Sequence, residues 1–117
     1  MTRTKTQSMT STVELGEVYV CVFPFTSGRG AKARPVLVLM DLGPDCLVCR
    51  ITAVPHRGFL DLPVTRWQEA GLEKPSTIRL SRLVTVEKSI LKVRIGSLAL
   101  EDLDQVRTMW NEKFRLK

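Results

Sequence analysis

Basic side chains and glycines alternate in residues 27–34, SGRGAKAR, directly before an apolar run. Arg29, Lys32 and Arg34 supply many hydrogen-bond donors, and Gly28 and Gly30 allow the backbone to approach a ligand closely. A loop of this kind suits an anionic ligand with oxygen acceptors. The lysine followed by serine or threonine that ends a nucleotide-binding P-loop is not present, so we do not expect nucleoside triphosphate binding.

Arg34 and Thr52 have side chains that suit a phosphate group. The planar guanidinium of Arg34 can contact two phosphate oxygens at once, and the Thr52 hydroxyl can donate one more hydrogen bond. Arg34 leads one expected strand and Thr52 lies late in the next, so a hairpin that turns near Gly43 and Asp45 brings them to one rim. Taken singly, each has an ordinary explanation, because arginine before proline suits a solvated loop and threonine is a common strand former.

The elements that position these residues are predicted mainly as strands. Valine, tyrosine and phenylalanine predict a strand within 16–25, which Pro24 limits, and a loop is expected over 26–34. The apolar run 35–40 predicts a buried strand that pairs with 46–54. The remaining expected elements are an edge strand at 59–64, a short helical turn that ends at Gly71, and one or two strands over 77–86.

The C-terminal residues 100–117 have the periodicity of an amphipathic helix. Leu103, Val106, Trp110 and Phe114 are spaced by three, four and four residues and form one apolar stripe. Acidic residues lie at the start of this segment and basic residues at its end, as the helix dipole favours. Many short strands and one late helix predict a small, strongly bent sheet or barrel.

The length and charge of the chain predict one domain with an anionic partner. Its 117 residues carry a formal net charge of +6, an excess that favours nucleic acid or an acidic protein as partner. Residues 1–13 are expected to form a disordered basic tail, and residues 14–117 a single domain. We see no signal peptide and no apolar run long enough to cross a membrane, so we expect a cytoplasmic protein.

The three cysteines are expected to be reduced thiols in the core. Cys46 and Cys49 form a C-x-x-C pattern, but on a strand a separation of three residues points them to opposite faces. With one histidine in the chain and no second C-x-x-C pair, no metal site is predicted.

Several segments, taken in their order along the chain, resemble the PemK/MazF family of toxin endoribonucleases from type II toxin–antitoxin pairs. They are GEVYVCVFPF, KARPVLVL, RITAV, AGLEKPSTIRLSRLVTV, IGSL and LDQVRTMW. The resemblance covers about residues 14–114. It implies a mainly β fold with a C-terminal helix, built as a compact, curved antiparallel sheet with an SH3-like barrel portion, in a homodimer.

The resemblance also implies cleavage of single-stranded RNA without a metal ion or cofactor, leaving a 2′,3′-cyclic phosphate and a 5′-hydroxyl. The family's catalytic arginine, which precedes the proline of the RP motif, falls on Arg34, and the hydroxyl residue of its IT motif falls on Thr52. Because arginine is a poor general base at neutral pH, His56 is a candidate acid or base, although the family motifs do not include it.

Other residues near the expected rim are candidates for contacts with RNA. They are Ser27, Arg29, Lys32, Arg50, Arg57, Ser76, Arg79 and Arg82, with Lys74 as a further cation. Contacts to phosphates hold an RNA strand without reading its sequence. Unstacked bases are read by stacking and by their edges, for which Phe25 or Trp67 is a candidate.

Two other functions stay open for a chain with this pattern. One is a toxin of the same fold that binds and poisons DNA gyrase without being an enzyme, and the other is a catalytically inactive nucleic-acid-binding module. The pair formed by Arg34 and Thr52 favours RNA cleavage, since a gyrase binder needs no rim that cleaves phosphate esters. The resemblance further implies a cognate antitoxin whose acidic, partly disordered tail competes with RNA for the basic groove.

Overall fold

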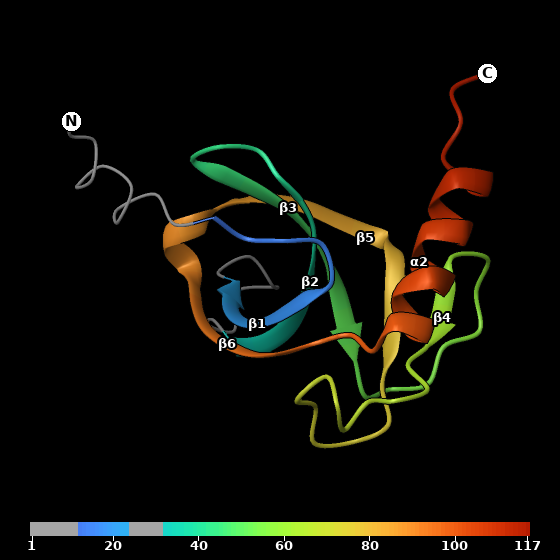
Figure 1. Ribbon diagram of the computed structural model, residues 1–117, viewed down its shortest axis with the longest axis horizontal. Coiled ribbons are helices and arrows are strands. Elements are labelled where there is room, and N and C mark those ends of the chain that lie inside the picture. Colours follow the sequence, from blue (N-terminus) through green and yellow to red (C-terminus); the bar gives the residue numbers. More distant parts are fainter. Residues whose placement is uncertain (1–11, 24–31) are drawn as a thin grey trace.

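The computed structural model describes residues 12–23 and 32–117, which form a strongly curved, open sheet of six antiparallel strands and a C-terminal α-helix (Figure 1). The strands follow one another across the sheet in the order β4-β5-β3-β2-β1-β6. The elements are β1 (Glu17–Phe23), β2 (Lys32–Asp41), β3 (Asp45–Thr52), β4 (Asp61–Pro63), β5 (Thr77–Glu87), the short 3₁₀ helix η1 (Lys88–Ile90), β6 (Leu91–Ser97) and α2 (Leu100–Lys113). The predicted fold class is confirmed, with the qualification that the sheet is curled rather than closed.

The hairpin of β2 and β3 turns at Gly43, as predicted. Gly43 has a φ of +95°, which a glycine adopts at little cost, and its amide donates a 2.8 Å hydrogen bond to Oδ1 of Asp41. The Leu42 amide donates to the Asp45 carbonyl over 2.9 Å and closes the turn. Beyond a bulge at Leu39, the pairing of the two strands aligns Val36 with Arg50.

The two faces of the sheet carry separate apolar clusters. Leu37, Cys49 and Ile51 belong to the larger cluster, which α2 covers, whereas Val36 and Cys46 belong to a second cluster on the other face. Cys46 and Cys49 therefore point to opposite faces, as the spacing predicted. All three cysteines are buried free thiols, and burial raises the pKa of each, which makes them unreactive.

The apolar stripe of α2 packs on the sheet as predicted. Val106 is fully buried, and Leu103, Trp110 and Phe114 pack against the larger cluster. The rings of Trp110 and Phe114 stack with their centroids 4.1 Å apart. Figure 1 shows α2 outside the curl that the strands form. No helix within residues 12–23 and 32–117 has the length and apolar character to cross a bilayer.

Asp102 does more than complement the dipole of α2. Its carboxylate is only 3% exposed and accepts hydrogen bonds of 2.9 and 2.8 Å from the amides of Thr65 and Arg66. It therefore caps a neighbouring turn, 37 residues away in sequence, and ties that turn to the helix.

One prediction along the chain needs correction, and one strand was not predicted. The loop was expected to run to Arg34, but Lys32, Ala33 and Arg34 pair with β1 and extend β2. The part of that prediction over residues 26–31 lies outside the described residues. Pro35 is tolerated inside this strand because pairing with β3 begins only at Val36. Strand β6 was missed altogether.

Strand β5 bends sharply where its partner in the sheet changes register. Cys49 of β3 pairs with Leu83, but the next residue, Arg50, pairs with Arg79. Residues 80–82 are therefore extra on the β5 side, and the Leu80 amide donates to the Leu60 carbonyl instead. This bend explains why 77–86 reads equally well as one or two strands.

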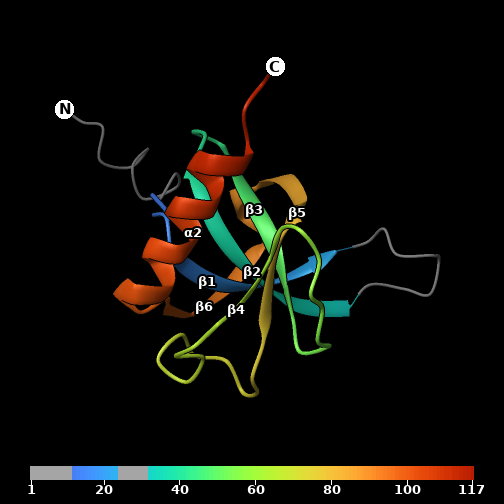
Figure 2. The same cartoon turned by 90° about the vertical axis from the view of Figure 1, so that its right-hand side faces the viewer.

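The segment 64–76 lies at the end of the sheet where β3 ends and β5 begins (Figure 2). It contains the predicted helical turn, in which the Leu72 amide donates to the Trp67 carbonyl, and Gly71 ends that turn with a φ of +85°. A Cβ on Gly71 would overlap the Ile95 carbonyl, and one on Gly96 would meet the Ala70 carbonyl. The segment is thus held against β6 by direct backbone contact.

Gly71→Ala is expected to destabilise the protein more than Gly43→Ala. A Cβ at Gly43 meets open space, so that variant loses only the backbone preference, about 1–2 kcal/mol. Alanine at Gly71 has the same backbone cost and must also push β6 away, which adds roughly 1–3 kcal/mol. Thermal denaturation followed by circular dichroism measures both variants, and equal losses of Tm would contradict the close approach of segment 64–76 to β6.

Candidate active site

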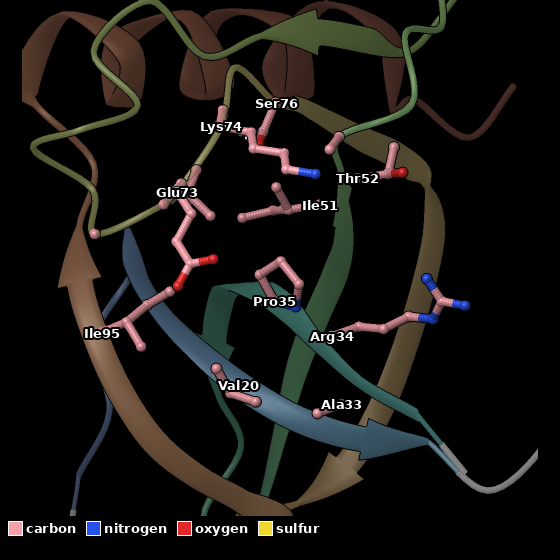
Figure 3. Close-up of a pocket in the computed structure, with 13 residues that line it drawn as sticks. Val20, Ala33, Arg34, Pro35, Ile51, Thr52, Glu73, Lys74, Ser76 and Ile95 are labelled. Carbon is pink, nitrogen blue, oxygen red and sulfur yellow. Dashed lines mark hydrogen bonds between the residues drawn. The ribbon is translucent and has the colours of Figure 1, made fainter. Parts of the chain in front are cut away.

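Arg34 and Thr52 are brought to the same face at one end of the β2–β3 hairpin. Val36 pairs with Arg50, and this register continued by two residues sets Arg34 opposite Thr52. Because side chains alternate along a strand, the side chains of Arg34, Thr52 and Arg50 leave the sheet on one face. Figure 3 shows the guanidinium of Arg34 and the hydroxyl of Thr52 on the same side of the strands.

Both groups are available to an anionic ligand. Oγ1 of Thr52 accepts a 3.1 Å hydrogen bond from the Val54 amide, which orients the hydroxyl and leaves its hydrogen to donate elsewhere. The half-buried Arg34 makes no ion pair with a carboxylate of the described residues.

Arg50 lies among three further arginines of β2 and β5, and the four are here called the arginine cluster: Arg34, Arg50, Arg79 and Arg82. Burial lowers the pKa of Arg50, and the charges of Arg34, Arg82 and Arg79 lower it further in that order. Nε of Arg50 is buried without a hydrogen-bond partner in the described structure. Arginine stays protonated despite such a shift, so the cluster is a concentrated patch of positive charge with an unused donor.

Among the described residues, Arg79 is the member of the cluster that forms an ion pair with a carboxylate. Its Nε donates to Oδ1 of Asp61 over 2.9 Å, and the side chains are 19% and 2% exposed. Burial alone would raise the pKa of Asp61, but hydrogen bonds from Arg79 and the Gly58 amide lower it overall.

A pocket of about 430 Å³ lies beside this rim. Its apolar floor comes from Val20, Pro35, Ile51 and Ile95, and Arg34 and Thr52 form part of its edge. Pro35 and Ile51 alternate with Arg34 and Thr52 along their strands, so the floor faces the opposite way from the guanidinium and hydroxyl groups (Figure 3).

The wall of the pocket is the segment 64–76. Glu73, Lys74 and Ser76 line it, and the Ser76 hydroxyl donates to the Lys74 carbonyl over 2.8 Å. Glu73 was not predicted as a site residue. The signal that could have found it is a single carboxylate next to a lysine within the otherwise basic stretch LEKPSTIR.

The remaining predicted residues lie apart from the pocket or outside the described residues. Lys32 and Arg57 are exposed and do not line the pocket. His56 does not line it either, so its role as acid or base stays a prediction. Trp67 packs against the larger apolar cluster. Ser27, Arg29 and Phe25 lie outside the described residues. Within the described ranges, no group of three or more metal-ligating side chains is placed to hold an ion.

Asp61→Asn is expected to lower stability at neutral pH, with a smaller effect in acid. The folded pKa of Asp61 lies below its ordinary value of about 3.9, so its ionised form stabilises the fold fully above that value. This stabilisation is lost as the pH falls through the lowered folded pKa. Tm values at about pH 7 and pH 3 test this, with the exposed Asp104→Asn as the matched control. A Tm difference between Asp61→Asn and wild type that does not shrink in acid would contradict the role of the Asp61 charge.

Comparison with known proteins identifies the family. Residues 14–113 match the model of the PemK-like, MazF-like toxins of type II toxin–antitoxin systems, whereas no curated protein matches the chain. An endoribonuclease from a mycobacterial species has a similar structure, with a TM-score of 0.70 and 15% identity over 88% of this chain and 91% of that one. The structure of the Mycobacterium tuberculosis toxin MazF-mt6 is similar with a TM-score of 0.69 and 22% sequence identity, covering 86% of this chain and 98% of that one. A mycobacterial endoribonuclease in complex with its cognate antitoxin has a TM-score of 0.69 and 18% sequence identity, covering 90% of this chain and 98% of that one. These likenesses agree with the fold, and the match over 14–113 shows that the chain belongs to the PemK/MazF toxin family.

Proposed function

We propose that this chain is the toxin of a type II toxin–antitoxin pair and acts as a metal-independent, sequence-specific endoribonuclease on single-stranded RNA. The observation that carries the proposal is the register that sets Arg34 opposite Thr52, beside the arginine cluster. Membership of the toxin family supports it, as do the similar structures of two mycobacterial endoribonucleases.

The arrangement suits attack by a ribose 2′-oxygen on the neighbouring phosphorus. A bond forms between the 2′-oxygen and phosphorus, and the bond from phosphorus to the 5′-oxygen breaks. The 2′-hydroxyl loses its proton and the departing 5′-oxygen gains one, which leaves a 2′,3′-cyclic phosphate and a 5′-hydroxyl. Negative charge grows on the other phosphoryl oxygens as this happens, and donors already aimed at them stabilise the transition state.

Arg34 and Thr52 are the donors that we assign to that charge. The guanidinium can contact two phosphoryl oxygens at once, and the Thr52 hydroxyl can donate to one of them. The other members of the cluster bind the flanking phosphates, and of these Arg50 and Arg82 make no ion pair with a carboxylate of the described residues. Contacts of this kind hold the RNA strand in place without reading its bases.

We further propose a cognate antitoxin, a homodimer and a cytoplasmic location. The acidic, partly disordered tail of an antitoxin complements the arginine cluster and competes with RNA for it. The net charge of +6 favours both partners, and one of the similar structures is an endoribonuclease bound to its antitoxin.

Arg34→Ala is expected to lower RNA cleavage by about 100-fold or more, because it removes the main donor to the phosphoryl charge. Its Tm should not fall, since the charge of Arg34 disfavours the neighbouring Arg50. Arg34→Lys keeps the charge without the planar fork and should be intermediate, and Thr52→Val should lose one hydrogen bond. The assay is incubation with a long unstructured RNA in EDTA, with fragment ends read by mass spectrometry. Cyclic-phosphate ends are expected.

Arg107→Ala is the matched control, because Arg107 is an exposed arginine on α2 and pairs only with Asp104 among the described residues. Full activity of Arg34→Ala with an unchanged melting curve would overturn the assignment of the site. If wild type leaves RNA intact, the function is not cleavage. A DNA supercoiling assay then separates a gyrase-binding toxin from a nucleic-acid-binding module.

A further inference from the structure

A carboxylate is unexpected next to a rim that is proposed to bind a polyanion. Glu73 lines the pocket whose edge is formed by Arg34 and Thr52, and its charge repels phosphate. Neither Glu73 nor its neighbour Lys74 makes an ion pair with the described residues. Figure 3 shows both side chains pointing into the pocket. They offer two acceptor oxygens on the Ile95 side of the pocket and a cationic donor on the Ile51 side.

The pocket is also built differently from the rim where phosphate is expected. Its floor is apolar and faces away from the guanidinium of Arg34, so the two halves of the site suit different parts of a nucleotide. Its volume of about 430 Å³ lies within the usual range for small-molecule sites, about 300–1,000 Å³. A nucleobase has an apolar face and a polar edge, which are the properties that this floor and this wall complement.

The wall that carries Glu73 and Lys74 is held in place on several sides. Gly71 lies against the β6 backbone, Leu72 is buried, and the Val64 amide donates to the Ser76 carbonyl over 2.9 Å. Asp102 fixes the start of the same segment. Recognition of a base edge requires such fixed positions, because a misplaced hydrogen-bonding group loses its selectivity.

We propose that this pocket binds a guanine base of the RNA next to the cleaved phosphate, with Glu73 as the residue that determines specificity. This inference rests on the proposed function. The Glu73 carboxylate accepts hydrogen bonds from N1–H and the exocyclic N2 amino group of guanine, and the Lys74 ammonium donates to O6. The apolar floor contacts the face of the ring.

Guanine is the base whose edge matches this pair of side chains. It presents two adjacent donors that a carboxylate can accept together, followed by an acceptor for a cation. Adenine and cytosine each present a single amino group on that edge, and uracil presents one N–H between two carbonyl oxygens. Glutamine in place of Glu73 keeps one acceptor but turns a donor toward guanine.

The test compares cleavage of short RNAs that differ only at the central base: UUGUU, UUAUU, UUCUU and inosine in place of guanine. Wild type is expected to prefer guanine in kcat/KM by about 10-fold or more, since a good bidentate contact to a base discriminates by that order. Inosine lacks the N2 amino group and should lose most of that preference. Glu73→Gln should lower kcat/KM on the guanine RNA and leave the adenine RNA nearly unchanged. Glu112→Gln, an exposed change of the same charge on α2, should behave as wild type.

The same comparison is made for binding with 2′-fluoro RNAs, which have no 2′-hydroxyl nucleophile, by fluorescence anisotropy. Weaker binding of the inosine strand by wild type but not by Glu73→Gln is the expected result. Cleavage or binding without preference for guanine, or an equal loss on every RNA in Glu73→Gln, would overturn the guanine pocket while leaving the nuclease intact. Selective binding of guanine without any cleavage would instead overturn the proposed function and retain the pocket.

Discussion

The site depends above all on the register of the β2–β3 hairpin. Because side chains alternate, one register sends Arg34, Arg50 and Thr52 to one face and Pro35 and Ile51 to the other. A slip of one residue would exchange the two sets and place charges in the apolar cluster. The turn at Gly43 fixes one end of the pairing. The bulge at Leu39 then resets the register, so that the correct residues reach the far end.

The same contacts that complete the fold also build the wall of the pocket. The Asp102 carboxylate joins α2 to the turn at residues 65–66, and Gly71 presses on β6. Between these anchors the chain has little freedom, so Glu73 and Lys74 project from a defined backbone. Strand β6 therefore serves the site through its backbone as well as through Ile95 in the pocket floor. A substitution at Gly71 or Asp102 is therefore expected to change both the stability of the fold and the shape of the pocket.

Much of this architecture is predictable from the sequence, because apolar runs, turn residues and helical spacing are local signals. The hairpin, the stripe on α2 and the opposite directions of Cys46 and Cys49 are of this kind. Strand β6 is not, because Lys92, Val93 and Arg94 are all exposed at the edge of the sheet and show no alternation. That strand forms because β1 offers an unpaired edge, which is information from elsewhere in the chain.

Contacts between side chains far apart in the sequence could not be predicted either, because they too depend on which segments the fold brings together. A basic residue near the rim is read as a ligand contact unless its partner is known, and the partner of Arg79 lies 18 residues away on β4. Asp102 likewise looks like an ordinary dipole complement until the turn that it caps is folded beside it. Glu73 gains meaning only when the fold sets it next to the RP and IT motifs.

Repulsion among the arginines of the cluster destabilises the folded state, and a bound anion would reduce that repulsion. Arg50 is held among three other guanidinium groups, and its buried Nε has no partner in the described structure. Among the four arginines, Asp61 pairs only with Arg79 in the described structure. Its hydrogen bonds from Arg79 and from the Gly58 amide hold the carboxylate in that position. An anion bound between the remaining arginines would satisfy the unused donor and relieve the repulsion. Because it binds the folded form alone, it would also stabilise the protein. Two anions compete for that role in the proposed function: the RNA backbone and the acidic tail of an antitoxin. In that proposal, whichever is bound excludes the other, so the same positive charge would serve both RNA binding and inhibition by the antitoxin.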